Sequence, residues 1–194
     1  MAIILASASA ARAKMLREAG VEIEVKAARI DETAIIEALT AEGVKPRDIA
    51  DALAEAKALR AANSAPPGVI VLAADQILSC ESRIFEKPGN RAAALAQLQA
   101  LRGKRHELWS AAAAARGGVV IWRHVEGARL TMRAASDEFL DDYLDQAGEA
   151  VLTSVGAYHL EGLGAQLFSR VEGDYFTVLG LPLLAVLDFL RTQG

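Results

Sequence analysis

The stretch VIVLAAD at residues 69–75 is the most apolar strand-like segment of the chain, and it decides how the flanking sequence is interpreted. It follows the chain break Pro66-Pro67-Gly68, and its β-branched residues indicate a buried strand over Val69–Leu72. We expect this strand to deliver Asp75 just past its end, where α/β proteins commonly bind ligands. A carboxylate in that place can bind a divalent metal or activate water, or it can simply cap the next turn.

Strand-like and helical segments alternate on both sides of this strand. Helices are expected at residues 10–19, 31–43, 46–62, 90–102, 136–147 and from 182 onward. Strands are expected at residues 3–6, 21–25, 106–115, 119–125, 128–133 and 166–171, with a hairpin over residues 77–85 that turns at Glu81-Ser82. The alternation predicts one layered α/β domain over residues 1–194, built on a mixed sheet.

Composition excludes several classes of function. The formal charge is −4, which disfavours a protein that coats polymeric nucleic acid. Cys80 is the single cysteine, so no internal disulfide can form, and a reducing compartment is expected. The apolar start of the chain lacks a basic leader and reads as a buried strand, and no apolar stretch is long enough to cross a membrane. These features predict a cytoplasmic protein without a membrane partner.

The segment Ser7-Ala8-Ser9 lies between an expected strand and an expected helix, with Arg12 one helical turn further on. The first amides of a helix are unpaired donors, and small residues let a phosphate approach them closely. Arg12 can then reach back with charge-assisted hydrogen bonds. The alternative is a common Ser9 N-cap followed by a solvated arginine.

Lys57 falls near the middle of an apolar helix face, which is built by Ala50, Leu53, Ala54 and Ala61. A lysine in that position must either extend its ammonium to water or meet a buried anion.

Two further residues are weaker candidates. Glu32 is a possible second carboxylate, or an ordinary acid in a first helical turn. Lys87 precedes Pro88, which favours extended backbone and suits a lysine aimed across a cleft, or merely an exposed hairpin lysine.

Several known site types are missing from the sequence. It contains no G-x-x-x-x-G-K-[ST] phosphate loop, no strand-borne G-x-G-x-x-G and no G-x-S-x-G elbow. Its histidines lack zinc-ligand spacing. The chemistries that depend on these motifs can be set aside.

These pieces occur in an order that resembles the Maf family of nucleoside triphosphate pyrophosphatases, along nearly the whole chain. The matching segments are Leu5-Ala6-Ser7-Ala8-Ser9 with Arg12, Ile30-Asp31-Glu32, Leu53-Ala54-Glu55-Ala56-Lys57-Ala58, Ala74-Asp75-Gln76, Glu86-Lys87-Pro88, residues 156–162 (GAYHLEG) and residues 178–183 (VLGLPL). Each segment is weakly specific alone, and together, in this order, they are strongly specific.

The resemblance implies an elongated α/β fold with a mixed twisted sheet and a cleft between two lobes. It implies a hydrolase of acid anhydrides that cuts between the α- and β-phosphates with Mg²⁺ or Mn²⁺, a house-cleaning activity. Carried over by position, the triphosphate-binding residues are Ser7, Arg12, Lys57 and Lys87; the metal ligands are Glu32 and Asp75, with Asp75 also the general base; the residues that vary with the accepted base are Gln76 and Glu161. It also suggests a homodimer.

Two features bear on the substrate. Family members usually carry a second arginine where this chain has Ala11, which puts tight phosphate binding in question. The pair Asp75-Gln76 and Glu161 look more like the branch that takes 7-methyl-GTP than the branch that takes dTTP and UTP, which usually has Asp-Thr. Because the family is also linked to septum formation, the alternative is a regulator of cell division that binds nucleotide with little turnover.

Overall fold

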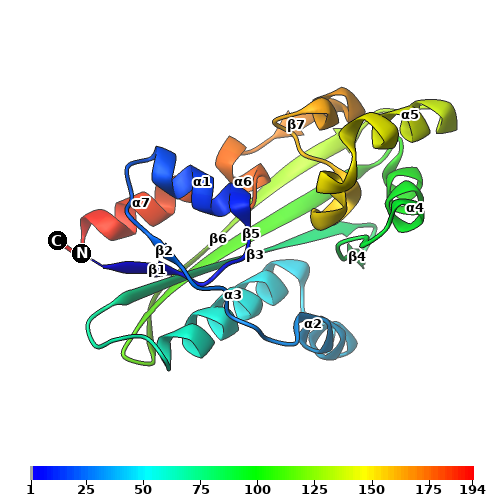
Figure 1. Cartoon of the computed structure of the whole chain (residues 1–194). Coiled ribbons are helices and arrows are strands. Elements are labelled where there is room, and N and C mark those ends of the chain that lie inside the picture. The colour runs from blue at the N-terminus through cyan, green and yellow to red at the C-terminus, as the bar shows by residue number, and fades with distance from the viewer. Residues whose placement is uncertain (1) are drawn as a thin grey trace. The chain divides into compact units, whose positions relative to one another are not determined.

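The structure, a computed structural model, describes residues 2–194 as a mixed α/β fold (Figure 1). Its strands are β1 (Ile3–Leu5), β2 (Glu24–Val25), β3 (Ile70–Cys80), β4 (Arg83–Phe85), β5 (Arg105–Arg116), β6 (Val119–Met132) and β7 (Phe168–Glu172). Its α-helices are α1 (Ala10–Glu18), α2 (Glu32–Ala41), α3 (Pro46–Ala62), α4 (Arg91–Leu101), α5 (Asp137–Ala147), α6 (Tyr175–Val178) and α7 (Leu183–Arg191). Three 3₁₀ helices cover Glu149–Thr153, Val155–Ala157 and Leu163–Leu167.

The strands form one seven-stranded sheet in the order β2-β1-β3-β5-β6-β7, with β4 paired to β3. β1 runs parallel to both β2 and β3, whereas β3–β4 and β6–β7 are antiparallel. The predicted α/β class with a mixed sheet is therefore confirmed.

The chain divides into two compact units. The first contains residues 1–76, 109–126 and 174–194, and the second contains residues 77–108 and 127–173. In the first unit α1 and α7 cover one face of the sheet and α3 lies against the other (Figure 1). The core under α1 and α7 includes Leu5, Leu16, Leu72, Val186 and Leu190.

Local sequence signals place most helix boundaries correctly. Asp31, Asn90 and Ser136 each accept a hydrogen bond from a backbone N–H in the first turn of α2, α4 and α5. α3 begins at Pro46 and ends at Ala62, as predicted. The hairpin turn at Glu81-Ser82 is also confirmed, because Cys80 pairs with Arg83 across it and both turn residues have positive φ, as in a type I′ turn.

Three predicted strand boundaries are wrong. The strand expected at 69–72 and the hairpin strand beginning at Ile77 are one strand, β3, because parallel pairing with β1 passes into antiparallel pairing with β4. The segments at 119–125 and 128–133 are likewise one strand, β6. Only Glu24–Val25 of the strand expected at 21–25 pairs with β1.

Candidate active site around Asp75 and Lys57

Asp75 lies in the middle of β3, not past its end as the sequence predicted. Its side chain is 10% exposed, and both carboxylate oxygens have partners. Oδ1 accepts a hydrogen bond of 2.7 Å from the backbone N–H of Gln76, and Oδ2 accepts one of 2.7 Å from Lys57 Nζ. The carboxylate is therefore fixed in orientation by the strand that carries it and by a helix that packs on that strand.

Lys57 lies on the buried face of α3 with Leu53 and Ala54, and only 9% of its side chain is exposed. Of the two alternatives left open by the sequence, the structure supports the buried anion. Lys57 Nζ lies 2.7 Å from Asp75 Oδ2 and 2.8 Å from Glu32 Oε1. A buried ammonium is costly without such partners, so the two carboxylates account for a cation on an apolar stripe.

Glu32 is the first residue of α2, directly after its N-cap Asp31. That position favours an acid, because the helix dipole is positive at its N-terminal end. The Glu32 side chain is 40% exposed, whereas the Asp75 side chain is only 10% exposed. Both readings of Glu32 thus hold together: it is a first-turn acid, and its carboxylate also meets the Lys57 ammonium.

Arg12 extends from α1 along a path fixed by three oxygen atoms. Its Nε donates to the Gly180 carbonyl at 2.8 Å, and Nη1 donates to the Ala74 carbonyl at 2.7 Å and to Ser7 Oγ at 3.2 Å. Burial lowers the pKa of Arg12 from its ordinary value, and the nearby negative charges of Asp75 and Glu32 oppose that shift. The predicted Ser9 N-cap is also present, because Ser9 Oγ accepts from Arg12 N–H.

Gln76 is held by a polar network that the sequence did not reveal. Its Nε2 donates to Ser110 Oγ at 3.0 Å and lies 3.1 and 3.0 Å from the carbonyls of Thr177 and Val178. Ser110 Oγ in turn donates to the Thr177 carbonyl at 2.7 Å. Carbonyls only accept, so they fix which end of the Gln76 amide is the nitrogen. The sequence did not indicate that Ser110 contacts the site, because it shows only a polar residue before the alanine run of β5.

Gly180 lies beside Arg12 and Gln76 in a backbone conformation that favours glycine. Its φ is +100°, and a Cβ placed there would lie 3.4 Å from Arg12 Nη2 and 3.7 Å from Gln76 Oε1. A side chain at this position would therefore be strained by its positive φ, and its Cβ would touch both residues at ordinary van der Waals distance. The VLGLPL segment of the sequence contains this glycine, but the sequence alone gave no physical reason why the position should be glycine.

Six of the predicted site residues thus come from the first unit and form one connected set: Ser7, Arg12, Glu32, Lys57, Asp75 and Gln76. The charges of Arg12 and Lys57 balance those of Glu32 and Asp75, so the set is close to neutral. Lys87 and Glu161 belong to the second unit and are both exposed. Their expected contacts with substrate stay predictions.

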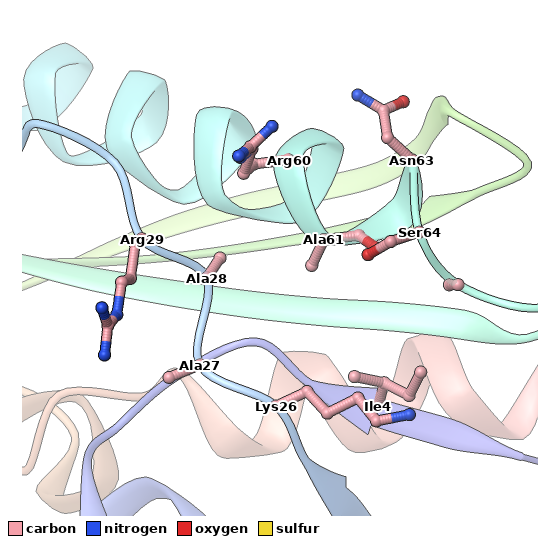
Figure 2. Close-up of a pocket in the computed structure, with 10 residues that line it drawn as sticks. Ile4, Lys26, Ala27, Ala28, Arg29, Arg60, Ala61, Asn63 and Ser64 are labelled. Atoms are coloured by element: carbon pink, nitrogen blue, oxygen red, sulfur yellow. The ribbon is translucent and has the colours of Figure 1, made fainter.

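A separate pocket of about 460 Å³ lies between residues 26–29 and the end of α3 (Figure 2). Alanines and Ile4 form much of its lining, and Arg29 and Arg60 point away from each other in Figure 2. Lys26 is paired with Glu24 at 2.9 Å, and Arg60 lies in the last turn of α3, where a cation complements the helix dipole. None of the predicted site residues lines this pocket.

Residues 2–194 lack two kinds of feature. They contain no group of three or more His, Cys, Asp or Glu side chains arranged to hold a metal. No helix in this range is both long and apolar enough to span a bilayer. The Asp75–Lys57–Glu32 arrangement brings together three of the expected site residues.

Comparison with known proteins identifies the family. The family described as "Maf-like protein" matches residues 2–193. The chain belongs to the Maf family. Among its Maf relatives, a protein of Paramagnetospirillum magneticum named nucleoside triphosphate pyrophosphatase is 56% identical over 98% of both chains. A protein of Rhizobium meliloti named 7-methyl-GTP pyrophosphatase is 48% identical over 99% of this chain and 96% of its own.

A solved structure is also similar to this Maf chain. It is titled nucleoside-triphosphatase / dITP/XTP pyrophosphatase from Mycobacterium abscessus, and it is 19% identical with a TM-score of 0.41. The match covers 70% of this chain and 76% of that one. The family resemblance read from the ordered motifs is confirmed by the family match and by the relatives.

Proposed function

We propose that this chain hydrolyses nucleoside triphosphates to nucleoside monophosphates and pyrophosphate. The observation that carries the proposal is the convergence of Asp75 and Glu32 on the buried Lys57 ammonium, with Arg12 beside them. Family membership and the names of the relatives support the same activity.

A divalent cation fits the residues present. Glu32 and Asp75 offer carboxylate oxygens, which are the donors that Mg²⁺ and Mn²⁺ prefer. The protein charges of the set nearly cancel, so a polyanionic triphosphate needs further positive charge to bind there. When bound, such an ion would neutralise phosphate oxygens and acidify a water molecule. Two carboxylates would leave its other ligand positions to water and substrate.

The chain's own residues have distinct proposed roles. Asp75 orients the attacking water and accepts its proton, because its carboxylate is held on a buried strand by the Gln76 N–H. Arg12 presents its guanidinium to the phosphates, already aligned by the carbonyls of Ala74 and Gly180. Ser7 supports that alignment through its hydroxyl. Aligned donors lose less freedom on binding, which favours the transition state.

We also propose which nucleobase the substrate carries. The Asp75-Gln76 pair and the relative named 7-methyl-GTP pyrophosphatase make 7-methyl-GTP the first substrate to test. The buried free thiol of Cys80 supports a reducing, cytoplasmic setting. We keep a single functional domain over residues 1–194 and a homodimer as parts of the proposal.

The test is a panel of 7-methyl-GTP, GTP, dTTP and UTP with Mg²⁺ or Mn²⁺, followed by separate assays of pyrophosphate and orthophosphate. Pyrophosphate release is expected, and in ¹⁸O-water the label is expected in the monophosphate, as attack on the α-phosphorus requires. Orthophosphate release would contradict the proposed cleavage. Nucleotide binding without either product would favour the regulatory alternative.

A further inference from the structure

Lys57 Nζ occupies the space between the two carboxylates that are candidates for metal binding. It lies 2.8 Å from Glu32 Oε1 and 2.7 Å from Asp75 Oδ2. Magnesium lies about 2.1 Å from its ligand oxygens. An ion shared by these two oxygens would need the volume that the ammonium fills, so the two cations exclude each other.

The second oxygen of Asp75 is already engaged. Asp75 Oδ1 already accepts a 2.7 Å hydrogen bond from Gln76 N–H, which turns Oδ2 toward Lys57. Asp75 belongs to a buried strand, so its carboxylate cannot move far without disturbing the sheet. Lys57, in contrast, ends a flexible four-carbon stem, and its ammonium can move while α3 stays in place.

We propose that Lys57 closes the Glu32–Asp75 pair to divalent metal until a polyphosphate draws its ammonium away. This inference rests on the proposed function and adds an order to it: metal and triphosphate bind together, and metal alone binds weakly. A polyphosphate offers Lys57 a replacement for the carboxylates it leaves, so the ammonium stays paired throughout. Because coupling between two ligands is reciprocal, the triphosphate strengthens metal binding and the metal strengthens triphosphate binding.

The arrangement has a chemical consequence. Without substrate, both carboxylates are paired with Lys57 and not with a metal that could activate water. Lys57 would thus leave Glu32 and Asp75 open to a metal chiefly when the triphosphate is bound, so that any water the metal acidified would lie beside the bond to be cut.

The experiment measures binding of Mn²⁺ alone, without nucleotide, by the electron paramagnetic resonance signal of free Mn²⁺. Lys57→Met vacates the space between the carboxylates and removes a cation in contact with both, so its Mn²⁺ affinity is expected to rise at least about tenfold. Lys14→Met, on the exposed surface of α1, should bind like the wild type. Equal affinities of Lys57→Met and wild type would overturn the proposal.

Two further variants separate exclusion from general electrostatics. Arg12→Gln removes a charge that acts on the same carboxylates but leaves the Lys57 ammonium between them. Its gain in Mn²⁺ affinity should be clearly smaller than that of Lys57→Met, and an equal gain would overturn the proposal. Lys57→Arg keeps the charge and should show no gain.

A last arm addresses folding and the proposed activity. If Lys57→Met is unstable without metal, Lys57→Gln provides a second uncharged variant that keeps a donor for one carboxylate. Mn²⁺ should raise the Tm of both variants more than that of the wild type, and the absence of this difference would contradict the proposal.

Pyrophosphate release by the wild type with unchanged Mn²⁺ binding by the variants would contradict this inference alone. The reverse result would sink the proposed function alone.

Discussion

Acid is predicted to destabilise the protein through the buried histidine of β5, His106. Only 1% of this residue is exposed, its Nε2 lies 2.8 Å from Tyr158 Oη, and Nδ1 has no hydrogen-bond partner among residues 2–194. Burial lowers the pKa of His106 from 6.5 to about 4. The unfolded chain therefore takes up a proton at a higher pH than the folded chain does.

The sign and size of the effect follow from these two pKa values. The contribution of neutral His106 to the free energy of unfolding is fully present above pH 6.5 and falls as the pH drops toward 4. Below pH 4 this group causes no further loss. Linkage gives a loss of about 1.4 kcal/mol at pH 5.5 and about 2.6 kcal/mol at pH 4.5. The limiting loss is about 3.4 kcal/mol, a large part of the stability of an ordinary domain.

Urea unfolding followed by circular dichroism at pH 7.5, 6.5, 5.5 and 4.5 measures this loss. His106→Phe keeps an aromatic ring beside Tyr158 and Phe168 but cannot titrate, so the difference between wild type and variant isolates the histidine. His124→Gln is the matched control, because the His124 side chain is 41% exposed. An unchanged dependence on pH in His106→Phe would refute the reasoning.

Two other substitutions test the structural support of the site. Gly180→Ala adds strain at φ +100° in the residue whose carbonyl accepts from Arg12 Nε, so it should lower the free energy of unfolding by ~1–2 kcal/mol and raise KM. Gly43→Ala, with φ +75° and nothing within 4 Å of its Cβ, should leave KM unchanged, and equal KM values for both variants would contradict the assigned contact. Gln76→Glu places a carboxylate oxygen against the carbonyls of Thr177 and Val178, so unfolding in urea at pH 8 should show a loss of ~2–3 kcal/mol. The exposed Gln146→Glu is its control, and a Gln76→Glu variant as stable as that control would exclude the network as described.

The sequence predicted the helices better than the strands. Caps at Asp31, Asn90 and Ser136 are local chemical signals, so helix starts could be read from nearby residues. The length of β3 depends on its partners, because β1 and β4 pair with successive parts of it. That is why Asp75 was expected beyond a strand end and lies within the strand. Strand pairing between distant segments is not encoded in local pattern.

The site shows the same division. Lys57 on an apolar helix face correctly indicated a buried anion, because a misplaced charge in a local pattern needs a partner. The pairing with both Glu32 and Asp75, however, depends on how α2, α3 and β3 meet. Ser110 and the Thr177 carbonyl could not be predicted, since they reach Gln76 from 34 and 101 residues away. The residue types were visible in sequence, and their mutual contacts were not.

The most direct measurement of the central claim compares kcat for pyrophosphate release in wild type, Asp75→Asn and Asp48→Asn. Asp75→Asn removes the proton acceptor and one carboxylate of the Lys57-centred pair, so kcat should fall by about 10²–10⁴-fold or more while circular dichroism stays native. Asp48→Asn, an exposed acid near the start of the same helix that carries Lys57, should keep wild-type kcat. An Asp75→Asn variant that releases pyrophosphate at the wild-type rate would contradict the account.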